Sequence, residues 1–218
     1  MRQVFRHHYD TNTWGNEQSV SGPGSTVEYT ENIRQMIPRI ASELGIKVIL
    51  DAPCGDFNWF RMIEWETEIQ YIGGDIVLPL VTQNQSLYGS EDKQFLHLDI
   101  VRDDLPHADL MLCRDCLLHL SHIDIARFLG NFLRSDIAYL LTSTYPECKK
   151  NRDIPTGYAR ELNLELPPFS FPPPLRVIED WVEGHPVRLL ALWERESLKN
   201  CLASNKAFQR LDKSVSRA

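Results

Sequence analysis

Short apolar runs that end at an acidic residue constrain the fold of this chain more than any other feature of its sequence. The first run is Val48-Ile49-Leu50, and Asp51 follows it directly. A short, continuous apolar run that stops at a polar turn is typical of a strand buried on both faces of a parallel sheet. Further runs of this kind predict strands at 69–74, 95–98, 109–113, 137–143 and 187–193.

Segments with helical periodicity separate these strands. They cover residues 26–44, 59–65, 77–88 and 121–133. Ser25 with Glu28, and Ser121 with Asp124, have capping-box spacing, which predicts that the first and last of these helices begin there. Alternating strands and helices predict right-handed βαβ units and a doubly wound, mostly parallel α/β sheet.

Acidic residues follow four of the predicted strands, namely Asp51, Asp75, Asp99 and, after Arg114, Asp115. In a doubly wound sheet the ligand binds at the carboxyl ends of the strands, so these side chains are expected near the site. Aspartate is also common in turns where strands end, and each of them alone is equally well explained as a turn residue. Together, and in series, they favour a binding site.

The organisation of the chain favours one domain over residues 1–218. An apolar fraction of 43% is enough for a real core, and no repeat or low-complexity linker divides the sequence. Residues 1–25 are polar and rich in turns, which predicts an N-terminal lid or loop. Residues 144–175 contain many prolines where a helix is expected, which predicts an irregular segment on the substrate side. Residues 196–218 form a polar tail with weak helical character.

Charge and hydropathy exclude several classes of partner. The net charge is −7, and Lys149-Lys150 is the only adjacent pair of basic residues, so nucleic acid is a poor candidate substrate. No stretch approaches the length of a membrane span, and the N-terminus lacks the apolar core of a signal peptide. The sequence therefore predicts a cytoplasmic protein, and it gives no indication of oligomeric state.

The five cysteines are odd in number and have no framework spacing, which predicts reduced thiols. Cys113 and Cys116 form one CxxC pair. A second such pair or a paired histidine motif is missing, so no metal site is predicted.

The turn after the first strand, Asp51-Ala52-Pro53-Cys54-Gly55-Asp56, is the best candidate for ligand binding. Gly55 lets the backbone approach a ligand closely, and the N–H groups beyond the turn are free to bind an anionic group. The dinucleotide fingerprint GxGxxG is absent because Asp56-Phe57-Asn58 follow Gly55. A nucleotide-dependent reductase on a similar sheet is therefore the weaker alternative.

This turn resembles motif I of class I S-adenosylmethionine-dependent methyltransferases, although Phe57 stands where the motif usually ends in glycine. The resemblance extends to Asp75-Ile76, Asp99-Ile100 and Arg114-Asp115 at later strand ends. It implies a Rossmann-like, seven-stranded sheet with helices on both faces and S-adenosylmethionine as cofactor. It also implies that Asp75 binds the ribose, Asp99-Ile100 the adenine, and Arg114-Asp115 the region of the methyl group. The cofactor contacts so expected are Trp14, Ser25, Asp51, Pro53, Cys54, Gly55, Asp56, Asp75, Ile76, Asp99, Ile100 and Arg114.

The flanking segments resemble a bacterial group of class I methyltransferases often found among polysaccharide-modifying enzymes. The similar residues include Trp14-Gly15, the segment Ser19-Val20-Ser21-Gly22-Pro23-Gly24-Ser25, and a downstream stretch from Asn151 to Phe169. This resemblance implies a small-molecule or glycan-type acceptor. It places the acceptor against Asn151, Arg160, Asn163 and Phe169.

Arg114, Asp115 and His119 are the candidate catalytic residues because they follow the fourth strand. Such a cluster can orient an acceptor and, for a hydroxyl, take its proton. The expected reaction is a direct displacement that depends mainly on alignment and desolvation. Three alternatives stay open: a surface ion pair for Arg114 and Asp115, a structural role for His119, and a non-catalytic module that binds the cofactor. The sequence does not disclose the acceptor or the atom that is methylated.

Overall fold

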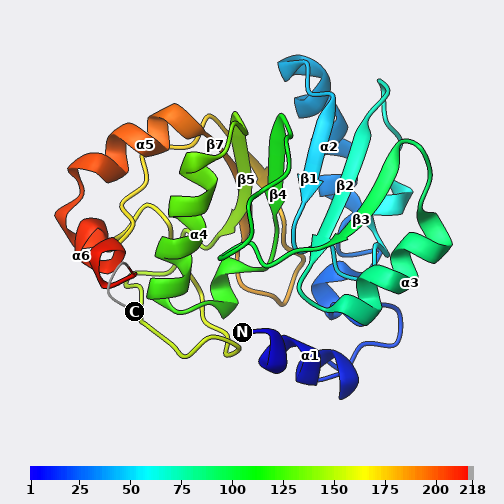
Figure 1. Ribbon diagram of the computed structural model, residues 1–218, viewed down its shortest axis with the longest axis horizontal. Coiled ribbons are helices and arrows are strands. Elements are labelled where there is room, and N and C mark those ends of the chain that lie inside the picture. The colour runs from blue at the N-terminus through cyan, green and yellow to red at the C-terminus, as the bar shows by residue number, and fades with distance from the viewer. Residues whose placement is uncertain (216–218) are drawn as a thin grey trace.

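The chain folds around a seven-stranded sheet with strand order β3-β2-β1-β4-β5-β7-β6 (Figure 1). A computed structural model describes residues 1–215 and the side chains as far as Leu211. The strands are β1 (Val48–Asp51), β2 (Gln70–Asp75), β3 (Lys93–His97), β4 (Leu110–Cys113), β5 (Tyr139–Thr144), β6 (Arg176–Glu179) and β7 (Leu189–Glu194). β1 to β5 pair in parallel, and β7 pairs antiparallel with both β5 and β6. The predicted Rossmann-like, mostly parallel α/β fold is confirmed.

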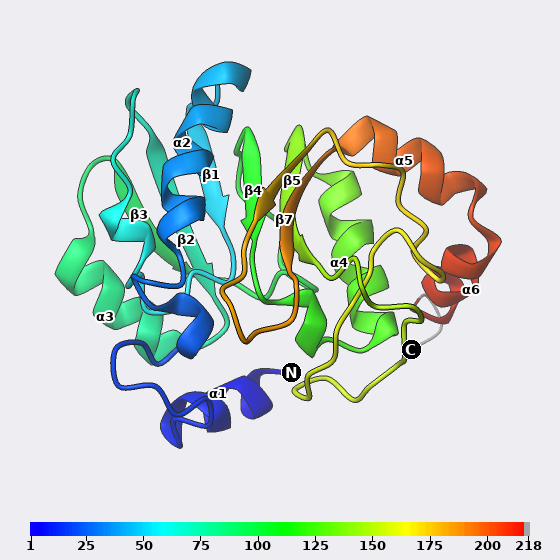
Figure 2. The ribbon, with the colours of Figure 1, turned by 180° about the vertical axis from the view of Figure 1, so that it is seen from behind.

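Two hydrophobic clusters, one on each face of the sheet, form the core. Successive side chains of a strand point to opposite faces. Leu50 accordingly belongs to one cluster with residues of α4, and Ile49 belongs to the other with residues of α2. Figures 1 and 2 show α4 in front of one face and α2 in front of the other. The helices are α1 (Arg2–Asp10), α2 (Glu31–Leu44), α3 (Leu78–Tyr88), α4 (His122–Arg134), α5 (Arg195–Ser204) and α6 (Lys206–Val215).

The order of the strands reverses between β1 and β4. From β1 the chain moves outward to β2 and β3, and it then returns to β4 on the other side of β1. Connections that diverge from two adjacent parallel strands leave a crevice at their carboxyl ends, where ligands bind in folds of this type. α1 lies across this edge of the sheet, below the strands in Figure 1.

One of the two predicted helix starts is confirmed. Ser121 is the N-cap of α4, and its side chain accepts a hydrogen bond from the Asp124 amide at 3.2 Å. The other prediction, that Ser25 caps a helix, is wrong, because α2 begins at Glu31 after the N-cap Thr30. α2 ends as expected at Gly45, which adopts the left-handed conformation at φ +67°.

Three local features differ from the sequence expectation. Residues 1–25, expected to form a lid or loop, contain the helix α1, none of whose residues is buried. The helix predicted at 59–65 is a short 3-10 turn, Phe60–Met62, because Trp59, Phe60 and Ile63 bury their side chains individually in the core. β6 was not predicted at all, because only Ile178 of its four residues is buried.

The long segment between β5 and β6 is irregular, with one isolated bridge between Thr156 and Tyr158. The C-terminal segment predicted to have weak helical character forms α5 and α6, and residues 216–218 lie outside the described residues. Over the part of the chain that the structure describes, no helix combines the length and apolar character that crossing a membrane requires.

Candidate functional site

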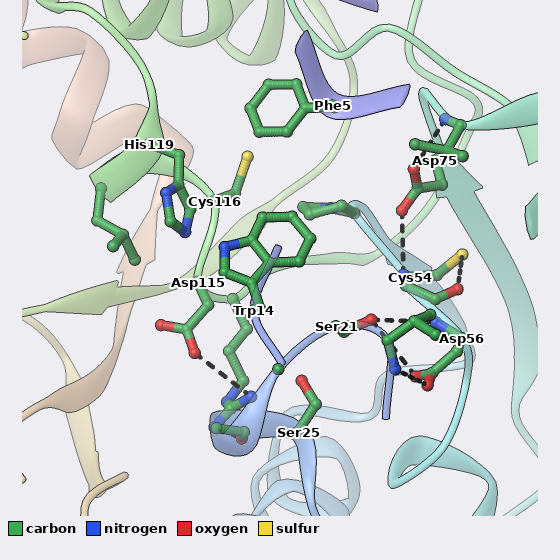
Figure 3. A pocket seen from close by; sticks show the side chains of 18 of the residues that line it. Phe5, Trp14, Ser21, Ser25, Cys54, Asp56, Asp75, Asp115, Cys116 and His119 are labelled. Carbon is green, nitrogen blue, oxygen red and sulfur yellow. Dashed lines mark hydrogen bonds and ion pairs between the residues drawn. The ribbon is translucent and has the colours of Figure 1, made fainter. Parts of the chain in front are cut away.

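A pocket of about 330 Å³ lies at the carboxyl ends of β1, β2 and β4. Its walls include the turn after β1, the segments after β2 and β4, and the N-terminal segment, and residues near the ends of β5 and β7 complete them. Figure 3 shows Asp75, Cys54 and Asp56 on one side of the pocket and Asp115 and His119 on the other, with Trp14 and Phe5 between. The sequence reasoning expected a site at this edge of the sheet.

Gly55 is at the closest approach between the turn after β1 and the N-terminal segment. Its φ angle is +56°, a conformation that side chains with a Cβ rarely adopt. A Cβ added at this position would lie 2.2 Å from the Ser21 hydroxyl oxygen. Both the backbone conformation and the space therefore favour glycine here.

Asp56 fastens the N-terminal segment to this turn. Its carboxylate accepts hydrogen bonds from the Ser19 hydroxyl and from the Val20 amide, both at 3.0 Å. Its own amide donates to the Ser21 hydroxyl at 3.2 Å. Asp56 lines the pocket, but its carboxylate is bound to the N-terminal segment.

Two buried aspartates line the half of the pocket next to β1 and β2. Burial raises the pKa of Asp51 to about 8, although the Tyr71 hydroxyl donates a hydrogen bond to its carboxylate at 2.9 Å. Burial also raises the pKa of Asp75 to about 6, against hydrogen bonds from the Val77 and Gly55 amides at 2.9 and 3.1 Å. At neutral pH Asp51 is therefore mostly protonated, whereas Asp75 is mostly ionised.

Four charged residues form a buried cluster at the end of β4. Arg114 binds both carboxylate oxygens of Asp180, at 2.9 and 2.8 Å, and the Gly24 carbonyl oxygen at 2.7 Å. Arg188 donates to Asp115 through Nη1 and to the Asp180 carbonyl oxygen through Nε. Burial alone would raise the pKa of Asp115, but Arg188 and Arg114 outweigh it and hold the pKa below its ordinary value. Asp115 is thus a stably ionised group and a weak proton acceptor.

His119 is arranged as a neutral imidazole. Its Nδ1 lies 3.0 Å from the Tyr158 carbonyl oxygen. A carbonyl oxygen only accepts hydrogen bonds, so Nδ1 carries the proton and Nε2 keeps its lone pair. Burial lowers the pKa of His119, which keeps the ring neutral at physiological pH. This residue can accept a proton, as a general base must.

The N-terminal segment forms an aromatic wall of the pocket. The Trp14 ring lies between the rings of His8 and His119, at centroid distances of 5.3 and 5.8 Å. Nε2 of His8 is 3.0 Å from the Gly157 carbonyl oxygen, which ties the N-terminal segment to the long irregular segment. Met1, Phe5 and Tyr9 also line the pocket.

The structure brings most of the predicted site residues together. Those that line the pocket are Trp14, Ser25, Asp51, Pro53, Cys54, Gly55, Asp56, Asp75, Ile76, Ile100, Arg114, Asp115 and His119. Asp99 does not: its side chain is turned into the protein, where it accepts a hydrogen bond from the Val101 amide at 3.1 Å.

The four residues expected on the acceptor side also lie outside the pocket lining. Phe169 is fully buried and packs edge-on against His122. The Asn151 amide group donates to the Asn163 carbonyl oxygen at 2.8 Å, so these two residues organise the irregular segment. Arg160 donates to the Leu117 carbonyl oxygen at 2.7 Å and so supports the turn that carries His119. Direct contact of these four with an acceptor stays a prediction.

Sequence reasoning missed several residues of the site. Arg188 and Asp180 come from the ends of β7 and β6, and no pattern in the sequence marks them. Tyr29, Tyr145 and His185 also line the pocket. Cys113 and Cys116 are free thiols, and among residues 1–215 no three His, Cys, Asp or Glu side chains are grouped to hold a metal ion.

No protein-family model and no curated protein sequence matches this chain. Solved methyltransferase structures do match its fold. The 1,6-didemethyltoxoflavin-N1-methyltransferase of Burkholderia thailandensis, solved with its substrate and S-adenosylhomocysteine, is 17% identical over 88% of this chain and 87% of its own, with a TM-score of 0.61. N-methyltransferase NodS of Bradyrhizobium japonicum WM9 is 11% identical over 77% and 96%, with a TM-score of 0.58. Magnesium protoporphyrin IX methyltransferase of Synechocystis PCC 6803, solved with S-adenosylmethionine, is 14% identical over 88% and 95%, with a TM-score of 0.57. At these identities the similarity establishes the shared fold.

Proposed function

We propose that this chain forms one methyltransferase domain that transfers a methyl group from S-adenosylmethionine to an oxygen or nitrogen atom of a small-molecule acceptor. The observation that carries the proposal is the pocket at the switch point of the sheet, which Asp51 lines and where Asp75 lies across from Asp115 and His119 (Figure 3). Three solved proteins with the same fold are methyltransferases, and two of them hold this cofactor or its demethylated product. A glycan-type acceptor rests on the sequence resemblance alone.

The residues of the pocket fit this cofactor. Gly55 lines the pocket and has no side chain, so a ligand can approach the backbone of this turn closely. Asp75 uses one lone pair on each carboxylate oxygen for backbone amides, and it retains others for ribose hydroxyls. Burial raises the pKa of Asp51, and a positive charge bound near its carboxyl group would lower that pKa again. A cationic ligand such as this cofactor therefore suits the site. The bound cofactor would supply an electrophilic methyl group on a sulfonium centre.

The residues at the end of β4 would act on the acceptor. His119 Nε2 takes the proton of an acceptor hydroxyl, whereas an acceptor amine that is already neutral needs no base. The ionised Asp115 stabilises the imidazolium that forms, since its charge favours protonation of His119. Trp14, Phe5 and Tyr9 exclude water from the reacting groups, which strengthens these interactions.

Calorimetric titration tests the proposal, with S-adenosylmethionine, S-adenosylhomocysteine, NADH and NADPH as ligands. Asp75→Asn should weaken binding of S-adenosylhomocysteine about tenfold to a hundredfold, the range for a hydrogen bond to a charged group. The matched control is Asp99→Asn, which also changes a buried aspartate after a strand but one outside the pocket. It should leave the affinity unchanged.

Three results would contradict parts of this proposal. Unchanged affinity in a folded Asp75→Asn variant would remove Asp75 from the cofactor site. Binding of NADH or NADPH in place of the adenosyl ligands would favour a reductase. Binding of S-adenosylmethionine with no methyl release across a panel of hydroxyl and amine acceptors would favour a non-catalytic module.

A further inference from the structure

Arg188 is placed in the pocket by the turn that joins β6 to β7. The residue directly precedes β7, is 5% exposed and lines the pocket beside Asp115. Its Nε and Nη1 atoms are both used: Nε donates to the Asp180 carbonyl oxygen at 3.0 Å, and Nη1 donates to the Asp115 carboxylate. The Tyr29 ring lies 5.0 Å from the guanidinium carbon.

The remaining nitrogen of Arg188, Nη2, is buried and has no hydrogen-bond acceptor within the described part of the chain. Buried polar groups are nearly always paired, and an unpaired charged donor carries a large desolvation cost. The Asp180 carboxylate does not pair with it: its two oxygens bind Arg114, and Oδ2 also lies 3.0 Å from Arg188 Nε. An acceptor oxygen supplied by a ligand would satisfy this atom.

Gly24, which also lines the pocket, is packed directly against this cluster. A Cβ at this position would meet the Asp115 carboxylate at 3.1 Å and Arg188 Nη1 at 3.5 Å. The absent side chain keeps the guanidinium next to the pocket. The unpaired donor of a planar guanidinium is best matched by a carboxylate oxygen, which is a strong acceptor.

We propose that Arg188 Nη2 binds a carboxylate oxygen of a ligand in this pocket, an inference that rests on the proposed methyltransferase function. Two ligands can bring a carboxylate to this place. One is the methionine part of the cofactor, and the other is an acceptor that carries a carboxylate near the atom to be methylated. Arg188 is then a specificity-determining residue.

Two pairs of probes separate the sources. S-adenosylhomocysteine carries the amino-acid carboxylate, and 5′-methylthioadenosine lacks the amino-acid part. Benzoate carries a carboxylate of a size suited to the aromatic wall, and benzamide is its neutral counterpart. Each probe is titrated by calorimetry into the wild type and into Arg188→Lys, which keeps the positive charge beside Asp115 but removes Nη2. The benzoate pair is titrated both with and without saturating S-adenosylhomocysteine.

A cofactor carboxylate on Arg188 predicts that the lysine variant binds S-adenosylhomocysteine about tenfold to a hundredfold more weakly and 5′-methylthioadenosine equally well. An acceptor carboxylate predicts that both nucleosides bind as before, while benzoate binds the wild type at least tenfold more tightly than benzamide and loses this preference in the variant. Equal weakening of both nucleosides, or no change with any probe, would overturn the proposal.

Control variants test whether the change in affinity is specific to Arg188. Arg195→Lys changes an arginine at the opposite end of β7 that also has a buried, unpaired Nε but lies outside the pocket, and it should change no affinity. If Arg188→Lys does not fold, Arg188→Gln retains one amide donor for Asp115 and takes its place. A wild type that binds neither nucleoside would contradict the proposed function, whereas the benzoate titration of the free protein would still decide the role of Arg188.

Discussion

Replacing Asp51 by asparagine should make the free energy of unfolding less dependent on pH. Asp51 is 3% exposed, and burial raises its pKa in the folded protein from 3.8 to about 8. The folded state therefore holds a proton that the unfolded state releases as the pH rises above 3.8. By linkage, the contribution of this proton to stability is complete below the unfolded pKa and is lost as the pH rises through the folded pKa. Asparagine is isosteric, can still accept the Tyr71 hydroxyl proton, and does not titrate.

The size of the effect follows from the separation of the two pKa values. Each pH unit between them is worth about 1.36 kcal/mol, so the wild type should lose on the order of 5 kcal/mol between pH 4 and pH 9 through this group. Between pH 5 and pH 8 the wild type should lose about 4 kcal/mol relative to Asp51→Asn. Any change in stability caused by burying the asparagine amide is the same at every pH, so it cancels when the pH dependence of the two proteins is compared.

Urea denaturation at pH 5, 6, 7, 8 and 9, without ligand, measures this difference for the two proteins. The control is Ile49→Val, which shortens a fully buried side chain on β1 and should cost about 1 kcal/mol at every pH. A difference between wild type and Asp51→Asn that stays constant from pH 5 to pH 8 would refute the reasoning. It would mean that water or a relaxed backbone solvates Asp51 better than its burial indicates.

Two further predictions concern the turn after β1 and the proton acceptor. Gly55→Ala should weaken binding of S-adenosylhomocysteine at least tenfold in calorimetry, since the new Cβ collides with Ser21. The control is Gly45→Ala, which has a similar φ of +67° but open space around it. It should lower stability in thermal unfolding by about 1 kcal/mol and leave the affinity unchanged. His119→Ala should lower kcat for a hydroxyl acceptor by about a hundredfold or more while S-adenosylhomocysteine affinity stays within about twofold, and wild-type kcat should rise with pH to a plateau reached below the ordinary histidine pKa. A matching loss of cofactor affinity would instead assign His119 to the cofactor site.

Most of the parallel strands could be predicted because burial on both faces gives a continuous apolar run; β3, in which only Phe95 is buried, is the exception to this pattern of burial. β4 is an example, since all four of its residues are buried. β6 is an edge strand with one buried residue, so its sequence has no such signal. A similar lack of burial explains α1, which has no buried residue; its Phe5 lines the pocket and is only partly buried against the core.

The site was predictable where the strand order alone brings residues together. Asp51, Asp75 and Asp115 meet because parallel strands end at one edge. Arg188 and Asp180 reach the same place through an antiparallel hairpin, and their role depends on tertiary contacts that no sequence spacing encodes. At Ser25 the sequence pattern predicted a helix cap that the structure does not have. Its spacing to Glu28 fits a capping box, but its carbonyl oxygen accepts from Asn58 and the helix begins later.

Asp51 and Asp115 are carboxylates in one pocket whose surroundings move their pKa values in opposite directions. Asp51 has a neutral partner, Tyr71, so burial dominates and the carboxyl stays protonated at neutral pH. Asp115 has two arginines, which outweigh burial and keep it ionised. Groups with pKa values pushed apart in this way have different tasks. The ionised Asp115 is too weak a base to remove a proton from a hydroxyl. In the proposed reaction this step therefore belongs to His119, and the proposed role of Asp115 is to stabilise the imidazolium that results.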